Sequence, residues 1–195
     1  MANPTGSDFR FCELKRLWKA IIPWKVKLFG WRWILGALPT RKELWHRGVI
    51  LGVEGSFCPL CELEEEFIGH LFLKCGKVKS IWKEVFLWFG MDFDYLLESS
   101  DIDTIVTGED VLLFLSNSLD GRVKSSFFAF IWSLVCWSIW NARNNLVFEH
   151  SIWNVVEILL IIKSIGWDWI SILSKGSIDI NRDLWFANPS NFIGL

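Results

Sequence analysis

The sequence predicts a mainly α-helical fold, in which helices flank a small Cys-Cys-His-Cys knuckle and an αα-hairpin follows it. Three observations predict this fold. Apolar residues recur at helical spacing in several segments. Three of the five cysteines and one of the three histidines lie together in FCPLCELEEEFIGHLFLKC, residues 57–75. Two long apolar segments, residues 125–148 and 152–173, are separated by a short polar break, which is typical of a helical hairpin.

The first third of the chain predicts three helices. A short one is expected over residues 13–20. Pro23 suits the first turn of the next helix, which continues to Leu35. A capping-box pattern beginning at Thr40 opens a third helix, which stops at Gly48. The second helix is apolar on nearly all sides, which is typical of a core helix; its expected core residues are Trp24, Val26, Leu28, Phe29, Trp31, Trp33, Ile34 and Leu35.

Beyond the knuckle, residues 77–89 have the clearest helical periodicity of the chain. One further helix is expected near residues 111–116. The helix over residues 152–173 is expected to loosen at Gly166, and the C-terminal tail DLWFANPSNFIGL is expected to be irregular. These elements predict three parts: a first domain over 10–95 that contains the knuckle, an acidic linker over 96–124, and a helical C-terminal region over 125–195.

Charge is distributed unevenly along a chain whose net charge is only −2. From Asp8 to Arg47, ten Lys and Arg residues stand against three acidic ones, a net charge of +7. From Met91 to Asp120, eight acidic residues occur without a Lys or Arg, a net charge of −8. The basic segment predicts either a nucleic-acid surface or intramolecular compensation of the acidic segment.

Cysteine usage and hydropathy indicate an intracellular, reducing compartment, either nucleus or cytoplasm. The five cysteines are odd in number and clustered with a histidine, which argues against a disulfide framework. The start MANPTGSDFR lacks the pattern of a signal peptide. The apolar run over residues 127–140 is shorter than the roughly 20 residues that cross a bilayer, so a buried helix is favoured over a membrane span. Cys12 and Cys136 each stand alone among apolar residues and are predicted in the core.

The cluster has the spacing Cys58-x2-Cys61-x8-His70-x4-Cys75. A CxxC turn presents two thiolates to one ion, and a nearby His and Cys complete a tetrahedral set that suits zinc. Four protein ligands leave no position for water, so the predicted Zn²⁺ site is structural rather than catalytic. A short helix over residues 67–74 is expected to carry His70. The alternative is three buried thiols and a core histidine.

The loop between the two halves of the cluster is acidic. One of its carboxylates can accept the free ring N–H of His70, and Glu66 is the one expected to do so. The others are expected to be surface charges, because isolated carboxylates are mostly exposed. The four residues are Glu62, Glu64, Glu65 and Glu66.

Three blocks of the chain carry a family resemblance: LWKAIIPWKVKLFGWRWILGALPTRKELWHRGV, CPLCELEEEFIGHLFLKC and IWKEVFLWFG. In this order they resemble the zinc-binding domain that follows the reverse transcriptase in plant-type retrotransposons lacking long terminal repeats. The resemblance runs from about Leu14 to Phe93. It implies that the four clustered residues are the zinc ligands and that Glu66 matches the acidic position four residues before the histidine. The later WSIWNARNNLVFEH resembles the connector before a ribonuclease H domain.

The sequence therefore predicts a non-catalytic zinc-binding module derived from a retrotransposon polyprotein. It contains no Tyr-x-Asp-Asp polymerase centre and no ribonuclease H acidic quartet, so an excised fragment or a derived host protein is expected. The first hypothesis is sequence-tolerant binding of RNA or DNA; the alternative is a structural or protein-interaction module that contacts other polyprotein domains. No membrane partner is expected, and the oligomeric state is left open. The residues expected to bind nucleic acid are Lys25, Lys27, Arg32, Arg41, Lys42, Lys74, Lys77 and Lys79.

Overall fold

The computed structural model describes residues 6–91, 103–118, 125–173 and 181–189, and within these ranges it is a helical assembly. Over the described ranges the only β pairing is an isolated antiparallel bridge between Phe57 and Glu65. The predicted mainly α fold is confirmed. Its elements are α1 (Gly6–Lys19), α2 (Trp24–Ile34), α3 (Arg41–His46), η1 (Val53–Ser56), η2 (His70–Lys74), α4 (Gly76–Trp88), α6 (Gly108–Ser118), α7 (Ser125–Glu149), α8 (Val155–Leu173) and α9 (Arg182–Ala187).

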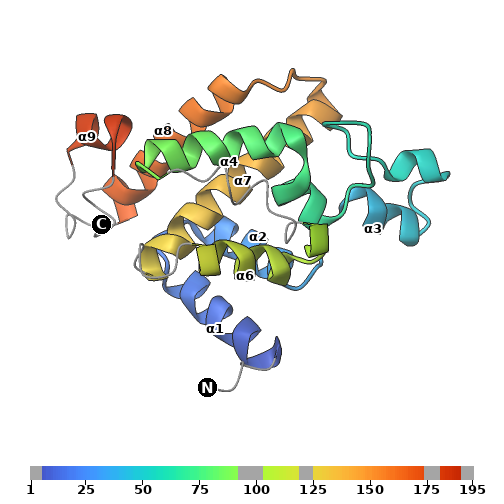
Figure 1. The fold of residues 1–195 in the computed structure, drawn as a ribbon, viewed down its shortest axis with the longest axis horizontal. Helices are drawn as coiled ribbons and strands as arrows, with labels where there is room; N and C mark the ends of the chain where they lie inside the picture. Colours follow the sequence, from blue (N-terminus) through green and yellow to red (C-terminus); the bar gives the residue numbers. More distant parts are fainter. Residues whose placement is uncertain (1–5, 92–102, 119–124, 174–180, 190–195) are drawn as a thin grey trace.

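Helix α7 is the centre of the assembly (Figure 1). It packs against α1, α2 and α8, while α4 packs on α8 and on the turn η2. The apolar run that resembles a membrane segment forms the buried part of α7, from Phe128 to Cys136. This part of the helix carries apolar residues on all its faces, and neighbouring helices cover it on several sides. No helix in the described part of the chain is long and apolar enough to cross a membrane.

The predicted αα-hairpin is formed by α7 and α8. Asn154 caps α8, because its side-chain oxygen accepts hydrogen bonds from the backbone N–H groups of Val156 and Glu157. Helix α8 runs through Gly166 without a break. A Cβ atom at Gly166 would lie 2.6 Å from the ring of Trp185 and 2.7 Å from Leu134. The glycine therefore serves close packing, and the expected loosening of the helix is wrong.

The C-terminal tail is not irregular throughout, because α9 forms within it. The side chain of Asn181 accepts hydrogen bonds from the backbone N–H groups of Asp183 and Leu184, which starts the helix. Trp185 is fully buried, and its indole N–H donates to the carbonyl of Lys163 on α8. One buried tryptophan and one cap thus order a segment that is too short to show helical periodicity.

Helix α2 is buried on one face only, which differs from the prediction. Its face towards α1 and α7 is covered, and the buried residues there include Val26, Phe29 and Trp33. The opposite apolar stripe is exposed: Trp24, Leu28, Trp31 and Leu35. Cys136 lies in the core as predicted, but Cys12 is exposed on α1.

One buried core runs through helices from both ends of the chain. Phe29 of α2 packs edge-on against Phe72 of η2 and against Trp137 of α7. Residues 103–118 contribute Ile105 and Leu115 to the same core. The predicted division of the chain into three parts stays a prediction.

Candidate metal centre

The first two cysteines lie in a tight turn held by backbone hydrogen bonds. The N–H of Cys58 donates to the carbonyl of Glu64 at 2.7 Å, and the N–H of Glu62 donates to the carbonyl of Cys58 at 2.8 Å. Glu62 has a φ of +59°, the left-handed conformation that closes such a turn. These bonds hold Cys58 and Cys61 on the same side of the turn.

The other two candidate ligands lie at the two ends of the π-helical turn η2: His70 is its first residue, and Cys75 follows its last. In an α-helix, residues five apart are rotated by about 500°, about 140° past a full turn, so their side chains diverge. Here the N–H of Cys75 donates to the carbonyl of His70 at 2.9 Å, which is the i to i+5 bond of a π-helix. This wider turn reduces the divergence, and both side chains face the CxxC turn. The short helix predicted around His70 is confirmed, with a π turn as its second half.

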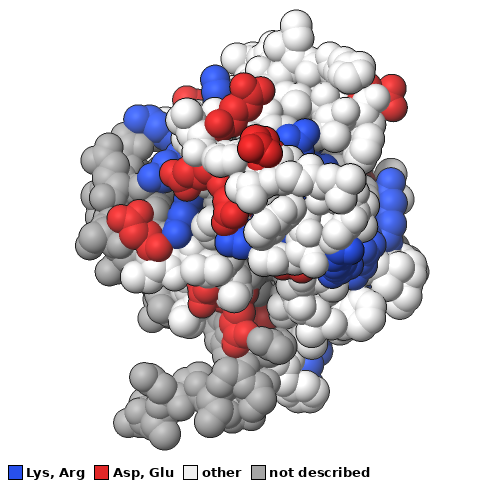
Figure 2. Space-filling view, turned by 90° about the vertical axis from the view of Figure 1, so that its right-hand side faces the viewer, with Lys and Arg blue, Asp and Glu red and all other residues white. Residues whose placement is uncertain are grey.

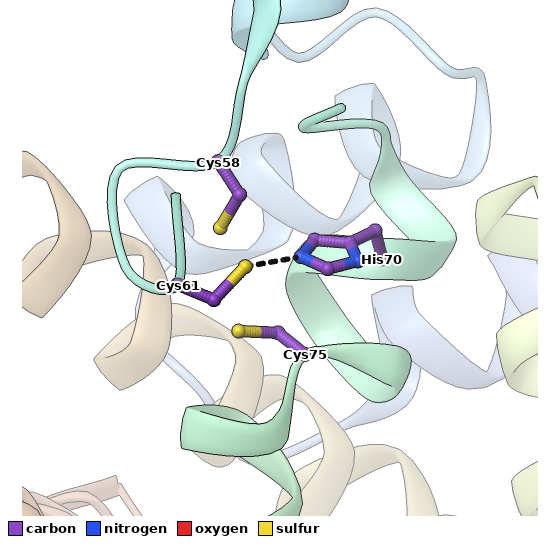
Figure 3. A group of neighbouring side chains, drawn as sticks. All are labelled: Cys58, Cys61, His70 and Cys75. Atoms are coloured by element: carbon purple, nitrogen blue, oxygen red, sulfur yellow. Dashed lines mark hydrogen bonds between the residues drawn. The ribbon is translucent and has the colours of Figure 1, made fainter. Parts of the chain in front are cut away.

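The four side chains converge on one point (Figure 3). One ligand atom from each residue, three sulfurs and one ring nitrogen, can be chosen so that all lie within 4.8 Å of one another. The Sγ of Cys61 lies 3.3 Å from the Nε2 of His70. Around a zinc ion with bonds of about 2.3 Å to sulfur, tetrahedral ligand atoms lie about 3.8 Å apart, so this group fits zinc. Cys58, His70 and Cys75 are buried, and Cys61 is half-buried.

The thiol and imidazole groups of the cluster shift one another's pKa values. A hydrogen bond with Cys75 raises the pKa of the Cys58 thiol to about 12, and burial adds to the rise. The same bond lowers the pKa of Cys75, with help from the backbone N–H of Lys77 at the start of α4. Burial lowers the pKa of His70, but hydrogen bonds and charge interactions with Cys58 and Cys61 outweigh it and raise that pKa to about 9. Zinc needs thiolates and neutral imidazole, so it would displace the protons of these groups.

The second ring nitrogen of His70 lies beside Glu64, not beside Glu66 as the sequence predicts. The distance from Nδ1 to the Oε2 of Glu64 is 3.1 Å, while the Glu64 side chain is 64% exposed. A carboxylate on Nδ1 orients the ring so that Nε2 faces the sulfurs. Glu64 was expected to be a surface charge; it remains largely exposed and also orients the histidine.

Glu66 is instead fully buried and binds Arg143 of α7. Its two carboxylate oxygens accept from Nε and Nη2 of Arg143 at 2.8 and 2.7 Å, a bidentate pair. It also accepts from the backbone N–H of Arg41, at the start of α3, at 2.7 Å. The two side chains are 0% and 3% exposed. This pair links the knuckle to the C-terminal hairpin, and sequence reasoning missed it because the two residues are 77 positions apart.

The eight residues expected to bind nucleic acid form separate groups. Lys25, Lys27 and Arg32 lie on α2, which packs on α1 and α7, whereas Lys77 and Lys79 lie on α4, which packs on α8. Figure 1 shows α7 between α2 and α4. The eight residues thus come from elements that pack on different helices, and their role in binding nucleic acid stays a prediction.

Three of the eight are engaged within the knuckle region. Lys42 pairs with Glu65 at 2.6 Å, Arg41 donates to the carbonyl of Phe57, and Lys74 donates to the carbonyl of Asp103. On the side of the molecule shown in Figure 2, acidic and basic side chains are interleaved over the described residues rather than separated by sign. Direct charge compensation among these three contacts is therefore confined to the pair of Lys42 with Glu65.

A comparison with protein families identifies the first part of the chain. Residues 5–82 match the family model described as zinc-binding in reverse transcriptase, and all four clustered residues lie inside the match. Searches of curated proteins and of solved structures gave no match. The matched family binds zinc, and the four converging side chains provide the ligand set that zinc requires. Residues 5–82 therefore match the family of zinc-binding domains in reverse transcriptases, and this match and the ligand cluster together support Zn²⁺ as the cofactor.

Proposed function

We propose that Cys58, Cys61, His70 and Cys75 hold one zinc ion as a closed structural site in a non-catalytic module that contacts nucleic acid. The observation that carries the proposal is the convergence of four ligand atoms, all from the protein. A zinc ion with four protein ligands has no open position for a water or a substrate. The chain's resemblance to retrotransposon domains supports its origin in such a polyprotein.

The basic surface of α1 and α2 supports nucleic acid as the partner. From Leu14 to Lys42 the sequence contains no acidic residue. The preceding acid, Glu13, is buried and paired with Arg16 of its own helix. The positive charges on α1 and α2 therefore keep a net field towards solvent, which attracts a phosphate backbone. Contacts of this kind tolerate any base sequence.

Binding to single-stranded RNA is expected to weaken steeply with salt. Each phosphate neutralised by a Lys or Arg contributes about −0.7 to the slope of log K against log salt concentration, so three to five contacts give about −2 to −3.5. The measurement is a salt titration of a fluorescent oligouridine strand against the zinc-loaded chain, followed by anisotropy.

Two double variants, measured in the same titration, compare the basic residues of α2 with those of α4. Lys25→Gln with Arg32→Gln removes two exposed charges from α2 and is expected to reduce the steepness of the slope by about 1.4. Lys77→Gln with Lys79→Gln removes two charges from α4 and is the matched comparison. A folded, zinc-loaded chain that binds no RNA at low salt would contradict the proposal.

A second candidate function is protein interaction through α4 and α8. A hollow of about 430 Å³ lies between these helices, and its lining includes Leu87, Val156 and Leu160, all of them exposed. An apolar surface of this kind is typical of an interface that is covered in a larger assembly. This candidate predicts that the isolated chain self-associates, and a monomer by light scattering would count against it.

A further inference from the structure

Four exposed aromatic side chains lie on α1 and α2. Phe11 and Trp18 are seven residues apart on α1, and Trp24 and Trp31 are seven residues apart on α2, so each pair lies on one helix face. Their exposed fractions are 60%, 37%, 65% and 41%. The rings of Trp18 and Trp24 lie 5.1 Å apart, which joins the two pairs. These four residues form the α1–α2 aromatic face, and Figure 1 shows α1 at the edge of the molecule, next to α2.

Positive side chains are placed among these rings. Lys15 lies over the ring of Phe11, with Nζ 4.9 Å from the centroid. Lys27 stands three residues after Trp24 and four before Trp31, on the same side of α2. Its Nζ donates to the carbonyl of Trp18 at 2.7 Å, which fixes the end of α1 against α2. Lys19, Lys25 and Arg32 add three further exposed charges to the two helices.

We propose that the α1–α2 aromatic face binds single-stranded nucleic acid by stacking unpaired bases on its rings. The inference rests on the proposed function and assigns it to a surface outside the zinc site. Flat rings bordered by cations are the combination that binds single strands irrespective of sequence, since every base has a π face and every nucleotide a phosphate. Bases within a duplex are stacked on one another and do not offer these faces.

The charges around the rings favour a nucleic acid over a protein as the occupant. The cores of protein interfaces are enriched in Trp and Phe but depleted in Lys. Here two lysines, Lys15 and Lys27, lie on the same helix faces as the rings, and no acidic residue lies between Leu14 and Lys42. A protein partner would have to bury or pair these ammonium groups, whereas a phosphate backbone neutralises them directly.

The test compares three versions of the zinc-loaded full chain with the same labelled oligouridine. Trp24→Leu with Trp31→Leu keeps the apolar area and removes the stacking rings. Trp24→Phe with Trp31→Phe keeps rings that can stack. Phe148→Leu is the matched control, because Phe148 is an exposed aromatic residue on α7, outside the face.

The two leucine substitutions are expected to weaken binding by roughly 25-fold or more, since each stacked base contributes a factor of at least about five. The salt slope should stay unchanged, because no charge is removed. The phenylalanine variant should bind within roughly threefold of wild type, and Phe148→Leu should bind like wild type. An RNA duplex should bind more weakly than the single strand and should not distinguish these variants.

Several results would overturn the inference. Equal binding by wild type and the leucine variant would show that the α1–α2 aromatic face is not part of the binding site, while the proposed function would still stand. An equal loss in the leucine and phenylalanine variants would exclude stacking. No binding by the wild type would instead refute the proposed function itself. Wild-type chains that sediment as a dimer, which oligouridine does not separate and the leucine variant does not form, would assign the face to a second copy.

Discussion

Removal of zinc is expected to unfold the knuckle and the helices that pack on it. The free energy of zinc binding to small structural sites is about 10–16 kcal/mol, and the stability of a whole domain is about 5–15 kcal/mol. The metal therefore contributes as much as the rest of the fold. The loss should spread beyond the knuckle, since Cys75 starts α4 and Phe72 of η2 packs against Trp33 of α2.

The same loss is expected for Cys75→Ser, because a serine hydroxyl does not replace a thiolate at zinc. Far-ultraviolet and tryptophan circular dichroism, with and without a chelator, measure the change. Cys12→Ser is the control; Cys12 is exposed on α1 and belongs to no cluster, so its replacement should change stability by less than about 0.5 kcal/mol. A chelated chain that keeps its tertiary signal and its melting temperature would contradict the expectation.

Replacement of Arg143 by Met is expected to destabilise the zinc-loaded chain by about 3–5 kcal/mol, because it leaves the buried carboxylate of Glu66 without a counter-ion. Glu66→Leu alone should have a similar effect, since it leaves the buried guanidinium of Arg143 without a counter-ion. The double variant should lose less than the sum of the two, because no uncompensated charge remains in the core. Chemical denaturation of the four proteins at fixed zinc concentration gives these values.

Arg47→Met is the matched control for the buried pair. Arg47 pairs with Glu43 on the surface, with a nitrogen–oxygen distance of 3.7 Å and side chains that are 55% and 40% exposed. Such a pair contributes about 0–1 kcal/mol, so its loss should be small. If Arg143→Met cost no more than Arg47→Met, the pair with Glu66 would not connect the knuckle to α7.

The zinc ligands could be predicted from sequence because the geometry of the site is local. The four residues lie within 18 positions, and ligand spacing limits which groups can reach one ion. Helices α4 and α7 could be predicted for a related reason, since burial of one face or of all faces imprints a pattern on the sequence itself. The capping box at Thr40 likewise predicted the start of α3, where the N–H of Glu43 donates to the Thr40 hydroxyl.

The features that sequence reasoning missed depend on contacts between distant segments. Nothing near Glu66 in the sequence indicates that Arg143 will reach it. Glu66 was predicted beside His70, but it binds Arg143, and Glu64 lies beside His70 instead. The hydrophobicity of α2 predicts burial but does not say which face has a neighbour, and the stripe containing Trp24 and Trp31 is exposed. Cys12 was predicted in the core but is exposed, because its apolar neighbours in the sequence do not say which face of α1 is covered. Helix α9 depends on the Asn181 cap and on the burial of Trp185 against α8.

The central claim is that one zinc ion with four protein ligands holds this chain together, and the X-ray absorption spectrum of the zinc-loaded wild type tests it most directly. The account predicts one zinc per chain, with three sulfur ligands at about 2.3 Å and one nitrogen ligand at about 2.0–2.1 Å. The sulfurs belong to Cys58, Cys61 and Cys75 and the nitrogen to His70. Fewer than three sulfurs, or a water oxygen in the ligand shell, would contradict the claim.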